Sequence, residues 1–243
     1  MSNKIVKRFY FKCLLACVFS TGWGLKAIAQ ADTTLQVINK YKVFSQQIHT
    51  DAGSQMVELK SVIPGIQYDL RYATTNNFTH HQLYKKGNKT YLRLPVANAL
   101  LKVQQELDSR GYGLKIFDAY RPYNVTKKMW ELVKDERYVA NPAKGSGHNR
   151  GIAVDLTIIH LKTGEELNMG TGFDNFTDSA HHDFFRFPAD ILQNRKLLKE
   201  TMEKYGFKAF DTEWWHYSWP NDKGFEVLDL DFKQLAKNSR KQD

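Results

Sequence analysis

The chain has 243 residues, of which 42% are hydrophobic and 13% are aromatic. This composition excludes an intrinsically disordered protein, because disordered chains lack the apolar surface needed to fold, and the length is enough for one domain with a sizeable core. The formal net charge is +9, but residues 1–29 hold five of the basic residues and no acidic residue, so the rest of the chain carries +4. That modest charge does not indicate nucleic-acid binding.

The first 29 residues have the pattern of an export signal. Basic residues precede an apolar stretch from Cys13 to Leu25, and the Ala-Ile-Ala sequence that ends at Ala29 is typical of a cleavage site. We therefore predict a signal peptide at residues 1–29, cleaved after Ala29, and a periplasmic protein with no stable membrane partner. A lipoprotein anchored at Cys17 is the alternative, because residues 14–17 read Leu-Leu-Ala-Cys. Both cysteines lie in this segment, so a metal site in the mature chain needs histidines and carboxylates.

The remaining chain predicts one folded domain between two polar segments. Residues 30–54 are weakly patterned and favour a linker, residues 55–232 favour the domain, and the basic residues 233–243 favour a solvated tail. In chain order, the apolar spacing and its proline and glycine boundaries predict helices at 95–110, 125–133 and 188–205, and strands at 114–117, 152–158, 207–210 and 214–219. Helices and strands do not alternate regularly, which indicates an α+β fold with a small, mostly antiparallel sheet and flanking helices.

The first segment that suggests chemistry runs from Ser146 to Asp155. It places His148 before a glycine turn and Asp155 on the following strand, on the face opposite to the apolar residues at 152, 154, 156 and 158. Imidazole nitrogen and carboxylate oxygen are ligands that Zn²⁺ accepts in a tetrahedral site. For this segment alone, the alternative is an ordinary hydrogen bond between a loop histidine and a strand aspartate.

The second segment, Glu213 to His216, supplies another histidine and a free carboxylate on either side of two tryptophans. Two histidines and one aspartate leave one coordination position open, which is the arrangement of catalytic zinc. We therefore predict one Zn²⁺ per chain, held by His148, Asp155 and His216, with Glu213 as the general base. Residues 213 and 216 face opposite sides of a regular strand, so this prediction requires a bulge or an irregular strand end. The alternative is that both tryptophans are core residues and their neighbours are exposed.

A zinc-bound water activated by the general base could attack a peptide carbonyl, and the carbonyl oxygen would then become negatively charged. Arg121 is the candidate for stabilising that charge. It follows the strand predicted at 114–117, where a loop can present its side chain to a cleft. A guanidinium is always charged and donates several hydrogen bonds, which suits this role. The alternative is a surface ion pair with Asp118.

These segments together resemble the D-alanyl-D-alanine dipeptidases, a zinc peptidase family that includes the vancomycin-resistance dipeptidases. The resemblance covers about residues 60–217 and implies the Hedgehog/D,D-peptidase-like fold. The matching blocks, in family order, are Tyr68–Thr74 with Asn77–Thr79, Asp118–Pro122, Ser146–Thr157, Met169-Gly170 with Phe173-Asp174, His181-His182, Asn194-Arg195 and Glu213–Tyr217.

The resemblance implies the same zinc ligands and general base, and it gives Arg121 the role of transition-state stabilisation. It further implies that Asp174 receives the ammonium group of the substrate, a small D-amino-acid dipeptide, and that Ser146 and Tyr72 help to hold it. A buried carboxylate that requires an ammonium partner would exclude peptides that are blocked at that end. His181 and His182 match the family without an evident chemical role, and loop packing or helix capping is the expected one.

The predicted activity is zinc-dependent hydrolysis of D-alanyl-D-alanine to free D-alanine in cell-wall peptide turnover. Resistance dipeptidases act in the cytoplasm, so the predicted export favours turnover or nutrient use over resistance. One alternative is a D,D- or L,D-carboxypeptidase that trims peptidoglycan stem peptides. Another is a non-catalytic wall-binding module, against which Glu213 argues, because binding alone needs no general base.

Overall fold

The computed structural model describes residues 34–85, 87 and 89–239, and the predicted signal peptide and Cys17 lie outside these residues. The helices are α1 (Tyr41–Thr50), α2 (Leu59–Val62), α3 (Leu94–Asp108), α4 (Tyr123–Leu132), α5 (Gly147–Arg150), α6 (Ala189–Lys204) and α7 (Phe232–Ser239). The strands are β1 (Val37–Ile38), β2 (Met56–Glu58), β3 (Gln67–Tyr68), β4 (Tyr91–Arg93), β5 (Tyr112–Asp118), β6 (Ala153–His160), β7 (Lys208–Phe210), β8 (Glu213–Ser218) and β9 (Val227–Leu228). Among the described residues, no helix is both long and apolar enough to cross a membrane.

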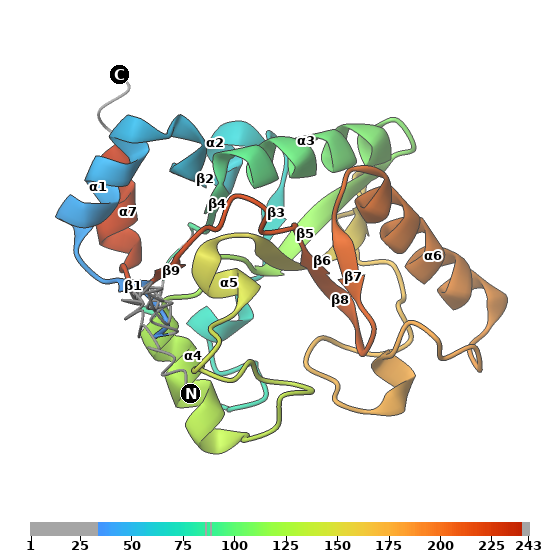
Figure 1. Ribbon diagram of the computed structural model, residues 1–243. Helices are drawn as coiled ribbons and strands as arrows, with labels where there is room; N and C mark the ends of the chain where they lie inside the picture. Colours follow the sequence, from blue (N-terminus) through green and yellow to red (C-terminus); the bar gives the residue numbers. More distant parts are fainter. Residues whose placement is uncertain (1–33, 86, 88, 240–243) are drawn as a thin grey trace, which may run out of the picture. The chain divides into compact units, whose positions relative to one another are not determined.

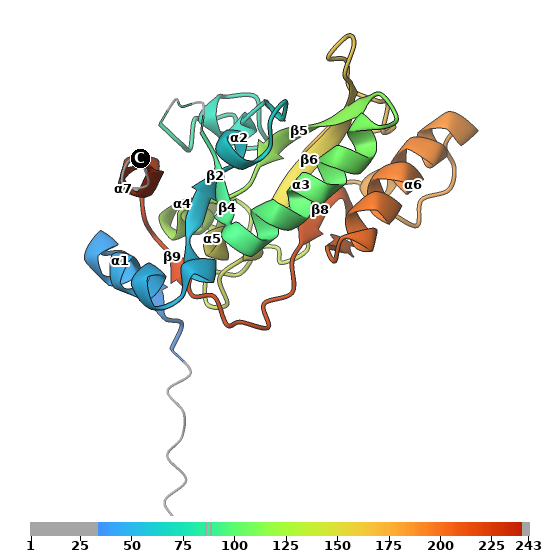
Figure 2. The same ribbon diagram turned by 90° about the horizontal axis from the view of Figure 1, so that it is seen from above.

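A five-stranded sheet forms the centre of the fold (Figure 1). Its strand order is β3-β5-β6-β8-β7, with β3 parallel to β5 and the other neighbours antiparallel. The helices α3 and α6 pack against this sheet and against each other (Figure 2). Their apolar side chains share one core with those of the sheet, including Leu100, Leu198 and Val154. This arrangement confirms the predicted α+β class with a mostly antiparallel sheet.

Proline and glycine set the ends of the two long helices, as the sequence predicted. Pro95 lies in the first turn of α3, where its missing N–H leaves no helical hydrogen bond unmade. Pro188 directly precedes α6. Gly111 and Gly206 follow the two helices with φ angles of 79° and 91°, which glycine adopts without the steric cost that other residues have there.

Strand β6 differs from its prediction, because it is buried on both faces. The apolar alternation predicted one buried face, but residues 153–159 are all buried. One face packs in the core that α3 and α6 share, through Val154 and Leu156. The other face carries Asp155 and Thr157, with 3% and 0% of their surface exposed, so polar side chains are enclosed there. A buried polar face has a specific partner or function more often than a solvated one.

The folded unit is longer at both ends than the sequence predicted. It begins at Leu35, and residues 35–54, predicted as a linker, contain β1 and α1. Residues 232–239, predicted largely as a solvated tail, form α7. A second core buries Phe44 of α1 and Leu235 of α7 around Tyr120. The prediction was wrong here because both helices are short and mostly polar, with 10 residues in α1 and 8 in α7, so few apolar residues mark them in the sequence.

Candidate active site

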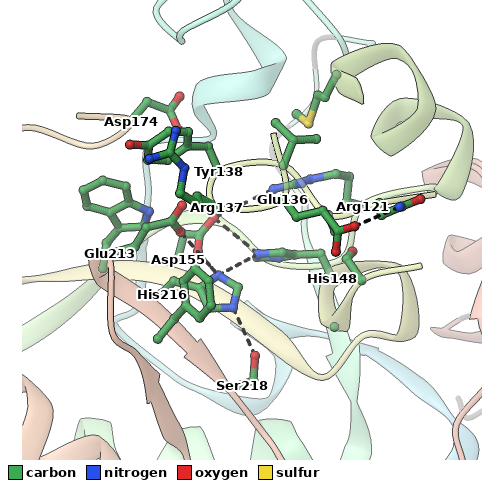
Figure 3. Close-up of a pocket in the computed structure, with 18 of the residues that line it drawn as sticks. Arg121, Glu136, Arg137, Tyr138, His148, Asp155, Asp174, Glu213, His216 and Ser218 are labelled. Carbon is green, nitrogen blue, oxygen red and sulfur yellow. Dashed lines mark hydrogen bonds and ion pairs between the residues drawn. The ribbon is translucent and has the colours of Figure 1, made fainter. Parts of the chain in front are cut away.

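A cavity of about 320 Å³ brings together all eight residues for which the sequence predicted a role (Figure 3). They are His148, Asp155, His216, Glu213, Arg121, Asp174, Ser146 and Tyr72. The cavity lies on the side of β6 and β8 that points away from the core shared with α3 and α6, because side chains alternate along a strand and Val154 and Tyr217 belong to that core.

His148, Asp155 and His216 form a compact cluster. Asp155 and His216 are directly paired across β6 and β8, and His216 Nδ1 lies 2.9 Å from Asp155 Oδ1. His148 reaches the same point from α5, with its Nε2 3.2 Å from His216 Nδ1 and 3.4 Å from Asp155 Oδ2. Among the described residues, this is the group of histidine and carboxylate side chains whose spacing could hold a metal ion.

Hydrogen bonds to the outer nitrogens orient both imidazole rings. His148 Nδ1 lies 2.7 Å from the carbonyl oxygen of Ala119. A carbonyl can only accept, so Nδ1 carries the proton and Nε2 presents a lone pair to the cluster. Ser218 Oγ lies 3.0 Å from Nε2 of His216 and can accept its hydrogen bond, which leaves Nδ1 to face the cluster. Metal-binding histidines are held by outer contacts of this kind.

The electrostatics of the cluster favour a cation. Burial by itself would raise the pKa of Asp155, but its neighbours His148 and His216 hold that pKa well below its usual value, so this buried carboxyl stays ionised. Burial lowers the pKa of His216, which keeps its ring neutral and its nitrogen able to bind a metal. Lone pairs of three such groups repel one another at these distances unless a positive charge lies between them. The residues therefore fit a metal ion.

Local sequence explains how α5 presents His148. Ser146 Oγ accepts a hydrogen bond from the backbone N–H of Asn149, and the Asn149 side chain accepts one from the N–H of Ser146. This reciprocal capping begins the helix, and Gly151 ends it with a φ of 70°. Ser146 also lines the cavity, and while its hydroxyl oxygen accepts this capping bond, its O–H can still donate to a ligand.

Glu213 reaches the cluster through the irregularity that the sequence prediction required. Ala209 of β7 pairs with Tyr217, but the next residue, Phe210, pairs with Glu213. Residues 214–216 of β8 are therefore an insertion relative to β7, and the insertion turns Glu213 to the face of the sheet that lines the cavity. Its Oε2 lies 4.0 Å from His216 Nδ1. Burial, followed by the charges of Asp155 and Asp174, raises the pKa of the Glu213 carboxyl, which makes it a stronger base once it is ionised.

Arg121 is both a cavity residue and the partner of Asp118. Its Nε donates to Asp118 Oδ2 over 3.0 Å, and its Nη2 lies 3.9 Å from Asp155 Oδ2. The pair is buried, with 1% of Asp118 exposed, whereas the alternative prediction placed it on the surface. Tyr84 donates to the other oxygen of Asp118 over 2.8 Å. The sequence did not indicate Tyr84, because its surroundings resemble those of any core tyrosine.

Asp174 lies at the cavity wall in a strained conformation. Its φ of 59° is unusual for a residue other than glycine. Tyr72 donates to its Oδ1 over 2.9 Å, and the backbone N–H of Phe78 donates to its Oδ2 over 3.3 Å. Burial raises the pKa of Asp174 to about 7 against the lowering effect of these bonds. A positive group beside this carboxyl would therefore be strongly favoured.

The sequence analysis missed the rim of the cavity. Residues 136–141 and Lys144, between α4 and α5, line it together with Phe176 and Phe210. The Tyr138 ring stacks on Phe176 with centroids 4.6 Å apart, so two loops meet at the rim. Apart from Phe210, which ends β7, these residues belong to loops without apolar periodicity or a recognisable motif, so no sequence signal indicated their place at the cavity.

His181 and His182 do not line the cavity. His181 follows the 3₁₀ helix Asp178–Ala180 as its end residue, and the backbone N–H of His182 donates to the carbonyl of Asp211 over 2.9 Å. Loop packing and helix capping, which the sequence analysis expected, account for these contacts.

Comparison with known proteins identifies the family of the chain. Residues 52–237 match the sequence family described as D-ala-D-ala dipeptidase. The chain belongs to this family. The D-alanyl-D-alanine dipeptidase of Escherichia coli (strain K12) is 32% identical over 175 residues, which cover 72% of this chain and 90% of that protein. The D-alanyl-D-alanine dipeptidase of Enterococcus faecium is 34% identical over 182 residues, which cover 65% of this chain and 88% of the relative.

The family is one of metallopeptidases, so this member of the D-alanyl-D-alanine dipeptidase family is an enzyme. Among solved structures, the LdcB LD-carboxypeptidase matches with a TM-score of 0.40 and 24% identity over 68% of each chain. That score is too low to add to the family assignment, which rests on the sequence matches.

The close contact between α5 and β6 yields a testable prediction for this family member. A Cβ on Gly147 would lie 2.8 Å from the Cβ of Ala153, which is fully buried on β6 and has no flexible end. Gly147→Ala should therefore push His148 away from Asp155 and weaken metal binding by about tenfold or more, as displaced supporting contacts do in other metal sites. Competition with a chromophoric chelator measures the affinity.

Gly172→Ala is the matched control, because a Cβ at Gly172 would meet nothing within 4 Å. An unchanged metal affinity in a folded Gly147→Ala variant would contradict the assignment of His148 to the metal.

Proposed function

We propose that the protein hydrolyses D-alanyl-D-alanine to free D-alanine, with one Zn²⁺ per chain held by His148, Asp155 and His216. The observation that carries this proposal is the convergence of these three donors with Glu213, Arg121 and Asp174 in one cavity. Two imidazoles and a carboxylate suit zinc and leave one position open, as in catalytic sites. The names of the relatives support the substrate, since each is a D-alanyl-D-alanine dipeptidase.

Zinc, when bound, would supply Lewis acidity that polarises the peptide carbonyl and makes water more acidic. Glu213 lies beside the ligand cluster, 4.0 Å from His216 Nδ1, and in the proposal its carboxylate takes a proton from the attacking water. It then gives that proton to the amine that leaves as the peptide bond breaks. The buried surroundings that raise the pKa of Glu213 favour both transfers.

Arg121 is proposed to stabilise the negative charge that develops on the carbonyl oxygen. Its guanidinium is held by Asp118 and stacks over the Tyr72 ring, with 5.0 Å between the guanidinium carbon and the ring centroid. A side chain fixed in this way needs little reorganisation during the reaction, which makes its charge more effective. Asp118 is in turn held by Tyr84, so the position of Arg121 is set by two buried contacts.

Asp174 is proposed to bind the ammonium group of the dipeptide, with Tyr72 holding its Oδ1. The side chain of Asp174 is half-buried, and its pKa of about 7 is high because burial opposes ionisation. An ammonium ligand would offset that cost, whereas an acylated amine would leave the carboxylate without a positive partner. This carboxyl is therefore the feature that favours a free dipeptide over a longer peptide.

Substitution of Glu213 tests the catalytic proposal. Glu213→Gln keeps the size of the side chain but removes the base, so the kcat for D-alanine release from D-alanyl-D-alanine should fall by about 10²–10⁴ while zinc affinity is kept. Glu200→Gln, on the exposed side of α6, is the control and should behave like the unsubstituted protein. If the Glu213→Gln variant releases D-alanine at the normal rate, Glu213 is not the base. If the unsubstituted zinc protein binds wall fragments without turnover, it is a wall-binding module.

Comparison of two substrates tests the role of Asp174. The protein should release D-alanine from D-alanyl-D-alanine and not from its N-acetyl derivative, and Asp174→Asn should lower kcat/KM for the free dipeptide by about 30-fold or more, as loss of one partner of a buried ion pair does. Asp178→Asn, on the exposed part of the same loop, should have no effect. Efficient cleavage of the N-acetyl substrate would identify a carboxypeptidase instead.

The raised pKa of Asp174 predicts that KM for the free dipeptide depends on pH. Below a pH of about 7 Asp174 takes up a proton and loses the charge that attracts the ammonium group. KM for the free dipeptide should therefore rise as the pH falls through 7, and Asp174→Asn should remove this dependence.

We also propose that the protein is exported and acts in the periplasm on dipeptides from cell-wall turnover. The support is the basic and apolar pattern of residues 1–29 with small residues at positions 27 and 29. Cell fractionation with N-terminal sequencing should find a periplasmic protein that begins at Gln30, and Cys17→Ser should leave its processing unchanged. Cytoplasmic protein that retains residues 1–29 would refute export, and loss of membrane attachment in Cys17→Ser would identify a lipoprotein.

A further inference from the structure

The loop of residues 168–182 carries Asp174, and it contains no strand and only one short 3₁₀ helix. Figure 1 shows this yellow-orange part of the chain between β6 and α6. Asp174 has a positive φ, 59°, which aspartate adopts more readily than most residues other than glycine but still at some cost. Contacts with other elements hold the loop in the shape that points Asp174 at the cavity.

Arg195 of α6 holds both limbs of this loop at once. Its Nε donates to the carbonyl of Met169 over 2.7 Å, on the limb that leads toward Asp174. Its Nη1 donates to the carbonyl of His181 over 3.0 Å, and its Nη2 to the carbonyl of Ser179 over 2.8 Å, on the limb that leads away. One planar guanidinium thus ties together residues ten or more positions apart, with a geometry that a lysine cannot reproduce.

The three hydrogen bonds to the loop are the main polar contacts of Arg195. Only 5% of its surface is exposed, and its guanidinium lies over the Phe187 ring at 4.8 Å. No ion pair of Arg195 is found in the described part of the chain, so its partners are backbone carbonyls. Burial lowers its pKa to about 10, which leaves it charged at neutral pH. A buried cation without a carboxylate is costly, and the three hydrogen bonds to backbone carbonyls offset that cost.

Two neighbouring contacts support the same function. Asn194 Nδ2 donates to the carbonyl of Asn168 over 3.0 Å, where the loop begins. Trp214 Nε1, directly after Glu213, donates to Thr171 Oγ1 over 2.9 Å. The loop is therefore fixed to α6 at its two ends and to β8 in between, and the segment around Asp174 has little freedom to relax.

We propose that Arg195 is a positioning residue for substrate recognition, which fastens the two limbs of the 168–182 loop so that Asp174 meets the ammonium group of the substrate. It touches neither the cavity nor the metal ligands, because it is absent from the residues that line the site. This inference rests on the proposed role of Asp174 in the proposed dipeptidase activity.

Substitution of Arg195 should weaken substrate binding and leave the rate of the chemical step almost unchanged. The groups at the reaction centre belong to α5, β6, β8 and the end of β5, and none of them is hydrogen-bonded to Arg195. Arg195→Lys should raise KM for D-alanyl-D-alanine by about tenfold or more, while kcat changes by less than about threefold, because a displaced binding group mainly weakens substrate affinity. Zinc affinity should be unchanged.

A double-mutant cycle separates positioning from a general loss of stability. If Arg195 acts through Asp174, then Arg195→Lys in an Asp174→Asn protein should change KM by less than about twofold, because coupled residues are not additive. Arg186→Lys, an exposed arginine before α6, is the control and should change neither KM nor kcat. The same tenfold rise in both backgrounds, or a fall in kcat or zinc affinity with KM unchanged, would overturn the proposal.

Binding without turnover provides a second measurement. Calorimetric titration of zinc-loaded Glu213→Gln protein with D-alanyl-D-alanine should give an affinity that Arg195→Lys weakens by about tenfold. Asn194→Ala, a milder change to the same fastening, should weaken it in the same direction and serves if Arg195→Lys fails to fold. If the protein neither binds nor cleaves the dipeptide, the proposed function fails. If it does both and these variants leave the affinity unchanged, only the role of Arg195 fails.

Discussion

The antiparallel register between β6 and β8 is the constraint on which the rest of the site depends. It places Asp155 directly opposite His216, so that two side chains more than 60 positions apart meet at 2.9 Å. A shift of the register by one residue would send one of them into the apolar core, because side chains alternate between the faces of a sheet. The large core formed with α3 and α6 fixes this register, since Val154 and Tyr217 are fully buried in it.

Around this pair, the site gathers more negative than positive charge. Asp155, Asp174 and Glu213 line one cavity with Arg121 as their buried cation. Asp155 raises the pKa of both Asp174 and Glu213, although burial has the larger effect on each. Such a cavity favours positive partners, and a metal ion with a substrate ammonium group would provide them. The electrostatics and the proposed reaction thus require the same arrangement of charges.

The site also divides its tasks between rigid and irregular parts of the fold. The proposed metal ligands and base lie on β6, β8 and a capped turn of helix, where the sheet limits movement. The proposed recognition groups lie on loops that other elements hold in place, as Arg195 holds the loop of Asp174. The second core extends this support, because Tyr120, next to Arg121, exchanges two hydrogen bonds with the backbone of Leu230. The segments at both ends of the folded unit therefore support the residue beside Arg121.

Much of this protein follows from its sequence alone. The long helices and the main strands follow from apolar periodicity and from prolines and glycines at their ends, which act over a few residues. The candidate ligands and base follow from the chemistry of histidine and carboxylate side chains at short spacing. The sequence also predicted that an irregular strand is needed for residues 213 and 216 to face the same site, because the two-residue period of a strand is a local property.

The tertiary structure decided what depends on partners distant in the chain. The insertion of residues 214–216 exists only through pairing with β7, and the buried bond from Tyr84 to Asp118 spans 34 positions. Likewise, α1 and α7 are short and mostly polar, and only their shared core shows that they belong to the folded unit. Local sequence determines which conformations a segment prefers, whereas burial and hydrogen bonding between distant segments determine which side chains meet.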